Sequence, residues 1–262
     1  IGMSHLRLLS TDFDGTLIEH FSDGRCTPEF AEVLLHHKKQ GGVWAVNTGR
    51  GLVHAMEGVE KFQAPVQPDF LLTNEREIFH RSREGDWVPE AGWNQTCYAR
   101  HDELFENSQA IFDWLRSHVD VKSGISLAEE NGQICGVITD TEADMNAFVE
   151  LLEKESVLMP DFSYQRNTIY LRFAHRDYHK GSTLGELCRV LGIRHDEVIA
   201  AGDHFNDVPM LDGRYAAYPC CPSNAITLVR ETVLAAGGHI ASQPAANGVA
   251  ESWHFFHAER AS

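Results

Sequence analysis

Short apolar runs alternate with amphipathic stretches over the first part of the chain. Each apolar run fits a buried strand, and the runs are 6–10, 43–46, 70–72 and 77–79. Between the first two runs, Thr27-Pro28-Glu29 predicts the start of a helix, because it offers a capping hydroxyl followed by a first-turn proline. Gly41-Gly42 predicts the end of that helix. The alternation favours βαβ units and therefore a parallel sheet.

The pattern changes over residues 85–178. Apolar spacing through Leu104, Ile111 and Leu115 predicts a helix, and Asn131-Gly132 predicts the turn of a hairpin. The other elements predicted in this stretch are a helix capped by Thr141 and strands at 162–166 and 168–173. These elements together predict an antiparallel α+β insert, which is a small domain of its own.

The α/β pattern resumes after the insert. Residues 184–191 predict a helix that ends at Gly192, and Val198 to Ala201 predicts a buried strand. We therefore predict an α/β fold with a Rossmann-like parallel-sheet core, made of residues 3–84 and 176–262, and an inserted α+β cap domain, residues 85–175. Ile1 and Gly2 precede Met3, a candidate initiator, and are left out of this prediction.

Composition narrows the function classes. The chain has 262 residues and a formal net charge of −16, which would repel the phosphate backbone of a nucleic acid. Its longest basic cluster, His36-His37-Lys38-Lys39, is too small to bind such a backbone, so nucleic-acid binding is excluded. No long apolar run and no secretory signal are present, which predicts a cytoplasmic protein without a membrane segment. The six cysteines include no Cys-x-x-Cys pair, which disfavours zinc and disulfides.

Polar motifs follow the predicted core strands or open a helix of the core. They are Asp12-x-Asp14-Gly15-Thr16, Thr48-Gly49-Arg50, Lys180 and Gly202-Asp203-x-x-Asn206-Asp207. Ligand sites of open α/β sheets lie at the carboxyl ends of the strands, so these motifs can converge at one edge of the sheet. Taken singly, each has an ordinary structural reading as a turn or a helix cap, and only their combination points to chemistry.

The combination meets the needs of metal-dependent phosphoryl transfer. Asp12 is the candidate nucleophile, and Asp14 is the candidate acid that protonates the leaving oxygen and later deprotonates water. Gly15 permits the turn that gives the two carboxylates different roles. Crowded carboxylates favour Mg²⁺, held by Asp12, the backbone carbonyl of Asp14 and Asp203, with Asp207 in support.

Further groups of the motifs suit the phosphoryl oxygens. Thr48 offers a hydroxyl and Gly49 a backbone N–H, while Lys180 supplies a positive charge. Asn206 fits a role in orienting Lys180 or the phosphate. The sequence therefore predicts a phosphate pocket beside the acidic residues.

These residues resemble the haloacid dehalogenase-like superfamily, whose four motifs are similar to residues 8–17, 46–50, 180 and 198–210. The resemblance implies Asp12 as nucleophile, Asp14 as acid/base, Thr48 and Lys180 as phosphate binders, and Asp203 as metal ligand with Asp207 in support. The long interval between the second and third motifs holds the cap. Its order of elements resembles the Cof-type and sucrose-phosphatase-like subfamily, which consists largely of sugar-phosphate phosphatases.

The expected activity is that of a Mg²⁺-dependent phosphatase acting on a small phosphorylated metabolite, foremost a sugar phosphate, through an aspartyl-phosphate intermediate. A mutase resembling phosphomannomutase and a non-catalytic phosphosugar sensor remain alternatives. The cap face that carries Tyr170 and Arg172 is either the surface that contacts the leaving group or an ordinary solvated sheet face. The expected partner is a small phosphate ester, and the oligomeric state, monomer or dimer, is open.

Overall fold

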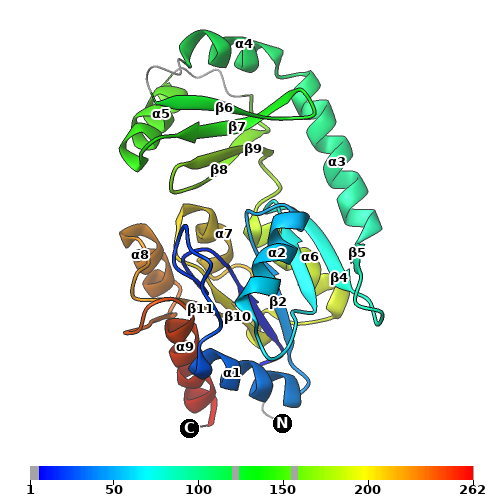
Figure 1. The fold of residues 1–262 in the computed structure, drawn as a ribbon, viewed down its shortest axis with the longest axis vertical. Helices are drawn as coiled ribbons and strands as arrows, with labels where there is room; N and C mark the ends of the chain where they lie inside the picture. The colour runs from blue at the N-terminus through cyan, green and yellow to red at the C-terminus, as the bar shows by residue number, and fades with distance from the viewer. Residues whose placement is uncertain (1–5, 120–123, 155–158, 262) are drawn as a thin grey trace. The chain divides into compact units, whose positions relative to one another are not determined.

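The computed structural model describes residues 6–119, 124–154 and 159–261, so Ile1, Gly2 and Met3 lie outside the described part (Figure 1). The chain divides into two compact units. Unit 1 contains Ile1–Asn94 and Lys180–Ser262, and unit 2 contains Gln95–His179. The cap domain predicted at 85–175 overlaps unit 2, and its role stays a prediction.

Unit 1 is built on one eight-stranded sheet with the order β12-β11-β10-β1-β2-β3-β4-β5. Its strands are β1 (Leu8–Thr11), β2 (Val43–Asn47), β3 (Phe70–Thr73), β4 (Glu77–Arg81), β5 (Trp87–Pro89), β10 (Val198–Ala201), β11 (Tyr218–Cys221) and β12 (His239–Ile240). Neighbouring strands from β12 to β3 pair in parallel, whereas β3 with β4 and β4 with β5 pair antiparallel. The predicted parallel α/β core is confirmed.

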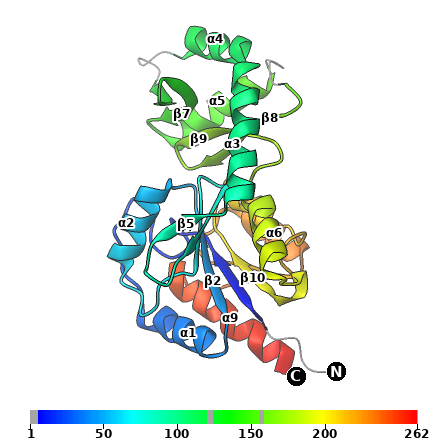
Figure 2. The same ribbon diagram turned by 90° about the vertical axis from the view of Figure 1, so that its right-hand side faces the viewer.

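Helices cover both faces of this sheet, as Figure 2 shows for α2 and α6. They are α1 (Pro28–Lys39), α2 (Leu52–Phe62), α6 (Lys180–Leu191), α7 (Val208–Leu211), α8 (Thr227–Ala235) and α9 (Ala245–Ala261), with 3-10 turns at His195–Glu197 and Phe205–Asp207. Side chains of α1, α2 and α9 fill one core layer, and those of α6, α7 and α8 fill the other. The doubly covered sheet explains why its strands read as nearly continuous apolar runs.

Local sequence signals place α1 as expected. The Thr27 hydroxyl accepts a hydrogen bond from the Phe30 N–H at 3.4 Å, and Pro28 is the first helical residue. Gly41 follows the helix with a φ of 80°, a left-handed conformation that favours glycine. The helix therefore begins and ends at the residues that the sequence indicates.

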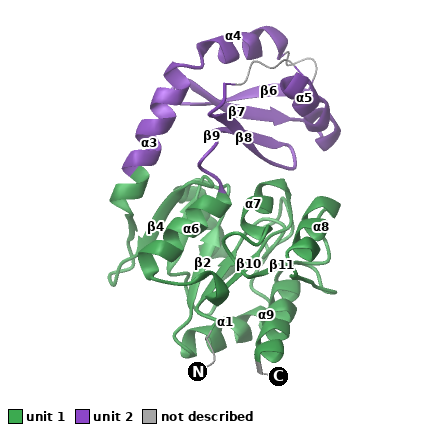
Figure 3. Ribbon diagram, turned by 180° about the vertical axis from the view of Figure 1, so that it is seen from behind, with its two compact units in different colours: residues 1–94, 180–262 green, residues 95–179 purple. Residues whose placement is uncertain are grey.

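Unit 2 is an antiparallel sheet with helices packed against it (Figure 3). Its strands have the order β6-β7-β9-β8. The elements are α3 (Ala91–Glu106), which starts in unit 1, α4 (Gln109–His118), β6 (Ile125–Glu130), β7 (Gln133–Thr139), α5 (Glu142–Lys154), β8 (Phe162–Asn167) and β9 (Tyr170–His175). Asn131 and Gly132, with φ of 51° and 76°, form the predicted hairpin turn.

Three details differ from the sequence-based prediction. The single helix expected through Leu104 and Leu115 is two helices, since Asn107 and Ser108 form a turn between α3 and α4. The strand expected from Thr168 begins at Tyr170, because Thr168 takes a left-handed φ of 50° in the turn after β8. The predicted boundary between core and cap, at residues 84 and 85, lies in the turn of the β4–β5 hairpin, which belongs to unit 1.

The absence of membrane-spanning helices and the state of the cysteines were also predicted from the sequence. None of the helices among the described residues has the length and apolarity needed to cross a membrane. The six cysteines are all free thiols. Burial raises the pKa of Cys188 to about 11, which suits an unreactive core residue.

Candidate active site

The site residues of unit 1 lie at the carboxyl ends of three adjacent parallel strands. Asp12 follows β1, Thr48 follows β2 and Asp203 comes two residues after the end of β10. The backbone N–H of Asp12 still donates to the Ala201 carbonyl at 2.9 Å, which continues the pairing of β1 with β10 up to the site. The sheet register therefore brings together motifs that are far apart in sequence.

Lys180 is the central cation of the site. It is the first residue of α6 and has no exposed surface. Its Nζ donates to Asp12 Oδ1 and to Asp207 Oδ1, both at 2.7 Å. Burial alone would lower the pKa of Lys180, but the charges of Asp12 and Asp207 raise it above its ordinary value. The neighbouring carboxylates therefore favour the charged ammonium, which is hydrogen-bonded to Asp12.

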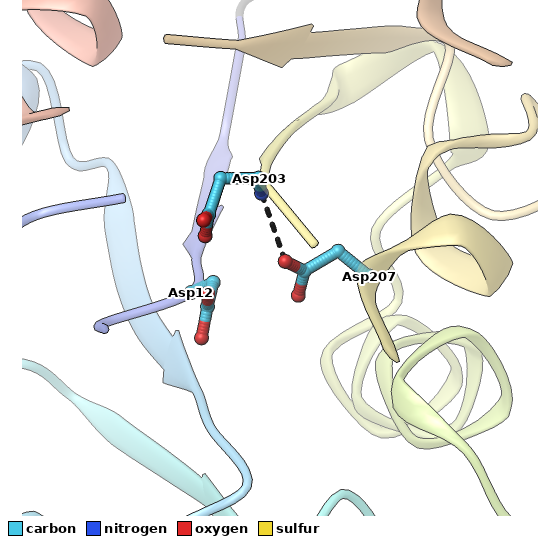
Figure 4. Close-up of side chains that lie close together, drawn as sticks. All are labelled: Asp12, Asp203 and Asp207. Carbon is cyan, nitrogen blue, oxygen red and sulfur yellow. Dashed lines mark hydrogen bonds between the residues drawn. The ribbon is translucent and has the colours of Figure 1, made fainter. Parts of the chain in front are cut away.

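Three buried carboxylates form the acidic part of the site (Figure 4). Asp12, Asp203 and Asp207 each offer an oxygen, and these oxygens lie within 4.8 Å of one another. Burial and the neighbouring charge of Asp207 raise the pKa of Asp12 well above its ordinary value. Hard carboxylate oxygens at this spacing fit Mg²⁺, whose charge would offset their repulsion.

Asp207 is hydrogen-bonded to the backbone of the loop after β10. Its Oδ2 accepts the backbone N–H groups of Asp203 at 2.8 Å and His204 at 3.0 Å. A Cβ at Gly202 would lie 2.4 Å from the Cβ of Asp207, so this position requires glycine. With one oxygen on the loop and the other on Lys180, Asp207 connects both elements, and the supporting role predicted for it stays a prediction.

Asp203 has two further partners from the loop after β1. Thr16 Oγ1 donates to its Oδ1 and His20 Nε2 to its Oδ2, both at 2.8 Å. Burial would raise the pKa of Asp203, but the hydrogen bond and charge of His20 lower it below its ordinary value. His20 was not singled out from the sequence, because it stands outside the four motifs.

Asp14 lies in a different environment from Asp12. Its carboxylate accepts two hydrogen bonds from Arg50, from Nε at 2.8 Å and from Nη2 at 2.6 Å. Asp14 is absent from the cluster of three carboxylates. The metal ligand predicted from Asp14 is its backbone carbonyl, and that ligand stays a prediction. Arg50 was quoted from the sequence as part of a motif, and the structure adds its partner.

The groups predicted to bind phosphate line the same end of the sheet. The Thr48 hydroxyl oxygen accepts the Arg50 N–H at 3.1 Å, which leaves its hydrogen to be donated. Asn206 Nδ2 donates to Glu75 Oε1 at 2.8 Å. A Cβ at Gly49 would lie 3.0 Å from that oxygen. Glu75 was missed in the sequence, because nothing local distinguishes it from other acids.

Tyr170 and Arg172 belong to unit 2 and not to this cluster. On β9, Leu171 and Phe173 are buried in the unit 2 core, whereas Tyr170 is 49% exposed. Arg172 lies beside Glu130, with its Nη1 3.8 Å from Glu130 Oε1. Tyr170 and Arg172 therefore alternate with buried residues within β9, and a role of these two side chains in substrate recognition stays a prediction.

The sequence of this chain is similar to one family of known proteins. The family described as haloacid dehalogenase-like hydrolase matches residues 73–252. A curated Streptococcus pyogenes protein, "Putative phosphatase M6_Spy0533", is 22% identical over 79% of this chain and 84% of its own length.

Solved structures share the fold over nearly the whole chain. The sucrose-phosphatase of Synechocystis sp. PCC6803, solved in complex with sucrose and phosphate, has a TM-score of 0.70 and 18% identity, covering 97% of this chain and 98% of its own. SMU.1108c of Streptococcus mutans UA159 has a TM-score of 0.68 and 15% identity, covering 97% and 99%.

Proposed function

Because the chain belongs to the haloacid dehalogenase-like hydrolases, we propose that it is a Mg²⁺-dependent phosphatase of a small phosphate ester and acts through an aspartyl-phosphate intermediate. The observation that carries the proposal is the buried Lys180, whose Nζ lies 2.7 Å from Asp12 Oδ1. An ammonium fixed against a strand-end carboxylate, beside two further aspartates, suits the transfer of a phosphoryl group to that carboxylate.

In the first half of the reaction, an Asp12 oxygen attacks phosphorus and the bond from phosphorus to the leaving oxygen breaks. Asp14 donates a proton to that oxygen, so the product leaves as an alcohol. Lys180, Thr48, Asn206 and the Gly49 N–H stabilise the charge on the phosphoryl oxygens. Asp14 must release Arg50 for this step, because both of its oxygens accept hydrogen bonds from that side chain in this structure.

In the second half, Asp14 accepts a proton from water, and the water oxygen attacks the phosphorus of the aspartyl phosphate. The bond between phosphorus and the Asp12 oxygen breaks, which restores the carboxylate and yields inorganic phosphate. Mg²⁺, when bound by Asp12, Asp203 and the Asp14 carbonyl, would supply positive charge for the phosphoryl oxygens and offset the repulsion between the carboxylates. Asp207 holds Lys180 and the loop of Asp203 in place.

A sugar phosphate is the proposed substrate class. The similarity to a sucrose-phosphatase supports it, together with the exposed Tyr170 on β9. We propose unit 2 as the cap that contacts the leaving group. Arg172→Ala is then expected to raise KM for sugar phosphates and leave hydrolysis of a small aryl phosphate unchanged. An unchanged profile over a panel of phosphate esters would contradict this role.

Trapping the intermediate tests the proposal. Wild-type protein with Mg²⁺ is mixed with an aryl phosphate and quenched in acid, and the peptide containing Asp12 is expected to gain the mass of one phosphoryl group. The Asp14→Asn variant is expected to accumulate more of this species, because the hydrolytic water then lacks its base. Phosphate release without any modified Asp12 would contradict the covalent route.

A further inference from the structure

Glu75 places a fourth buried carboxylate among the groups proposed to bind phosphate. It lies in the turn between β3 and β4, and it is 5% exposed. Its φ is 64°, in the left-handed region that favours glycine. A charged side chain that is buried in an unfavourable backbone conformation suggests a function that offsets the cost.

The backbone of Glu75 is anchored on both sides. Its N–H donates to the Thr48 carbonyl at 3.1 Å, and its own carbonyl accepts the Thr183 hydroxyl at 3.0 Å. These bonds join the turn to the Thr48 loop and to α6, the helix that carries Lys180. The carboxylate is therefore held at a fixed place beside the site.

The two oxygens of this carboxylate differ. Oε1 accepts Asn206 Nδ2 at 2.8 Å and would lie 3.0 Å from a Cβ at Gly49. Oε2 is buried and has no hydrogen-bond partner among the described residues. Only one of the two oxygens thus has a hydrogen-bond partner, and that partner is the amide of Asn206, a residue proposed to bind phosphate.

The carboxylate of Glu75 affects how a phosphate can bind to Asn206. The Asn206 amide nitrogen carries two hydrogens, and one of them is directed to Glu75. A phosphoryl oxygen that binds Asn206 either displaces Glu75 or lies beside it. Displacement loses a buried hydrogen bond, and proximity brings two anions together at low dielectric, so both weaken phosphate binding.

We propose that Glu75 is a specificity-determining residue that competes with phosphate for the Asn206 amide and keeps the affinity for inorganic phosphate low. The inference rests on the proposed phosphatase function. A weak hold on free phosphate favours product release. It also weakens the binding of the phosphate group of an ester, so a substrate must gain binding energy from its leaving group.

The variants Glu75→Gln and Glu77→Gln form a matched pair. Each removes one buried carboxylate, Glu75 from the turn between β3 and β4 and Glu77 from the first position of β4. Glu77 accepts hydrogen bonds from Thr73 at 2.9 Å and Asn74 at 3.2 Å, and it has no hydrogen bond to Asn206. Glu75→Gly is a second test variant, because its backbone already has a glycine-like φ.

The measurement is the dissociation constant of inorganic phosphate in the presence of Mg²⁺, by calorimetry, for all four proteins. We expect about tenfold tighter binding by Glu75→Gln and Glu75→Gly, an order of magnitude set by removing one nearby charge. Glu77→Gln is expected to bind as the wild type does. The inhibition constant of phosphate in aryl phosphate hydrolysis is expected to follow the same order.

Three different results would contradict the inference. If the wild type binds phosphate and the Glu75 variants bind it equally or more weakly, Glu75 does not compete with phosphate, and the phosphatase proposal stands. If all four proteins hydrolyse the aryl phosphate and none binds phosphate with Mg²⁺, this inference alone is contradicted. If none of them binds phosphate and none hydrolyses the aryl phosphate, the phosphatase proposal fails together with this inference.

Discussion

At the scale of single residues, Lys180 connects two carboxylates of the site. Its ammonium is the shared partner of Asp12 and Asp207, and none of its surface is exposed. Removing one partner from such a buried network leaves uncompensated charge, which is costly. Lys180 therefore links the stability of unit 1 to its proposed chemistry.

The variant Lys180→Met is expected to lower kcat by about 10³-fold. This is the upper end of the range of losses seen when one group that stabilises the charge of a transition state is removed. It is also expected to lower the free energy of unfolding by about 3–5 kcal/mol, because two carboxylates lose a buried partner. Steady-state kinetics and urea unfolding measure the two effects. An unchanged free energy of unfolding would show that the buried ion pairs are absent.

Asp14 is expected to matter according to the leaving group. Asp14→Asn removes the proposed proton donor, and a basic alkoxide needs that proton far more than a nitrophenolate does. The loss of kcat/KM is therefore expected to be at least about tenfold larger for a sugar phosphate than for p-nitrophenyl phosphate. Equal losses for the two substrates would contradict the role of Asp14 as general acid.

Sequence reasoning at this scale could name the residues that stand in recognisable motifs. Asp12, Asp203 and Asp207 were selected because strand ends deliver them, and the structure does gather them. His20 stands outside the motifs, and Glu75 could not be selected because its contacts depend on a backbone turn with a positive φ at that residue. A single sequence does not reveal such turns when the residue is a glutamate.

At the scale of elements, the turn after β1 controls the geometry of the site. Gly15 has a φ of 83°, and a Cβ there would lie 2.2 Å from both Asp203 Oδ2 and His20 Nε2. Gly41, after α1, has a φ of 80° and nothing within 4 Å of the same position. Alanine at either position would strain the backbone, but only alanine at Gly15 would also clash with side chains of the site. Comparing the two variants therefore distinguishes the effect of the strain from that of the clash.

Gly15→Ala is expected to lower kcat/KM at least about 100-fold, since Asp203 must move by an ångström or more. Gly41→Ala is expected to cost about 1 kcal/mol of stability through its left-handed backbone and to leave kcat unchanged. Kinetics and urea unfolding of both variants check this. Equal activity of the two variants would contradict the contact between Gly15 and Asp203.

Element boundaries were predictable where one residue type decides them. Thr27 and Gly41 bound α1, and Asn131-Gly132 forms the hairpin turn. The break between α3 and α4 could not be predicted, because the apolar spacing of Leu104 and Ile111 continues across it. Ser108, whose hydroxyl donates to the Leu104 carbonyl at 2.5 Å, satisfies the end of α3 without glycine or proline.

At the scale of the whole molecule, each unit has its own core and its own weak points. In unit 2, His101 on α3 accepts the backbone N–H of His175 on β9 at 3.0 Å. Both ring nitrogens of His175 face donors, Asp177 N–H at 3.1 Å and Arg100 Nη2 at 3.2 Å. Burial and the charge of Arg100 lower the pKa of His175 below 6.5.

This shift predicts how the stability of unit 2 depends on pH. The unfolded chain takes up a proton at His175 near pH 6.5, before the folded chain does, so stability falls as pH decreases from there toward the folded pKa. Above pH 6.5 the contribution is fully present. His175→Gln is expected to lessen the drop in thermal midpoint between pH 7.5 and 5.5. The exposed His54→Gln serves as control, and an identical drop in all three proteins would contradict the prediction.

The central claim is that Asp12 is the nucleophile of a Mg²⁺-dependent phosphatase. The most direct measurement is phosphate release from p-nitrophenyl phosphate by wild type and Asp12→Asn, each with Mg²⁺ and with EDTA. Asp12→Asn keeps the shape of the side chain and removes its charge. We predict release only by the wild type with Mg²⁺. Release by Asp12→Asn at the wild-type rate, or by the wild type in EDTA, would contradict the account.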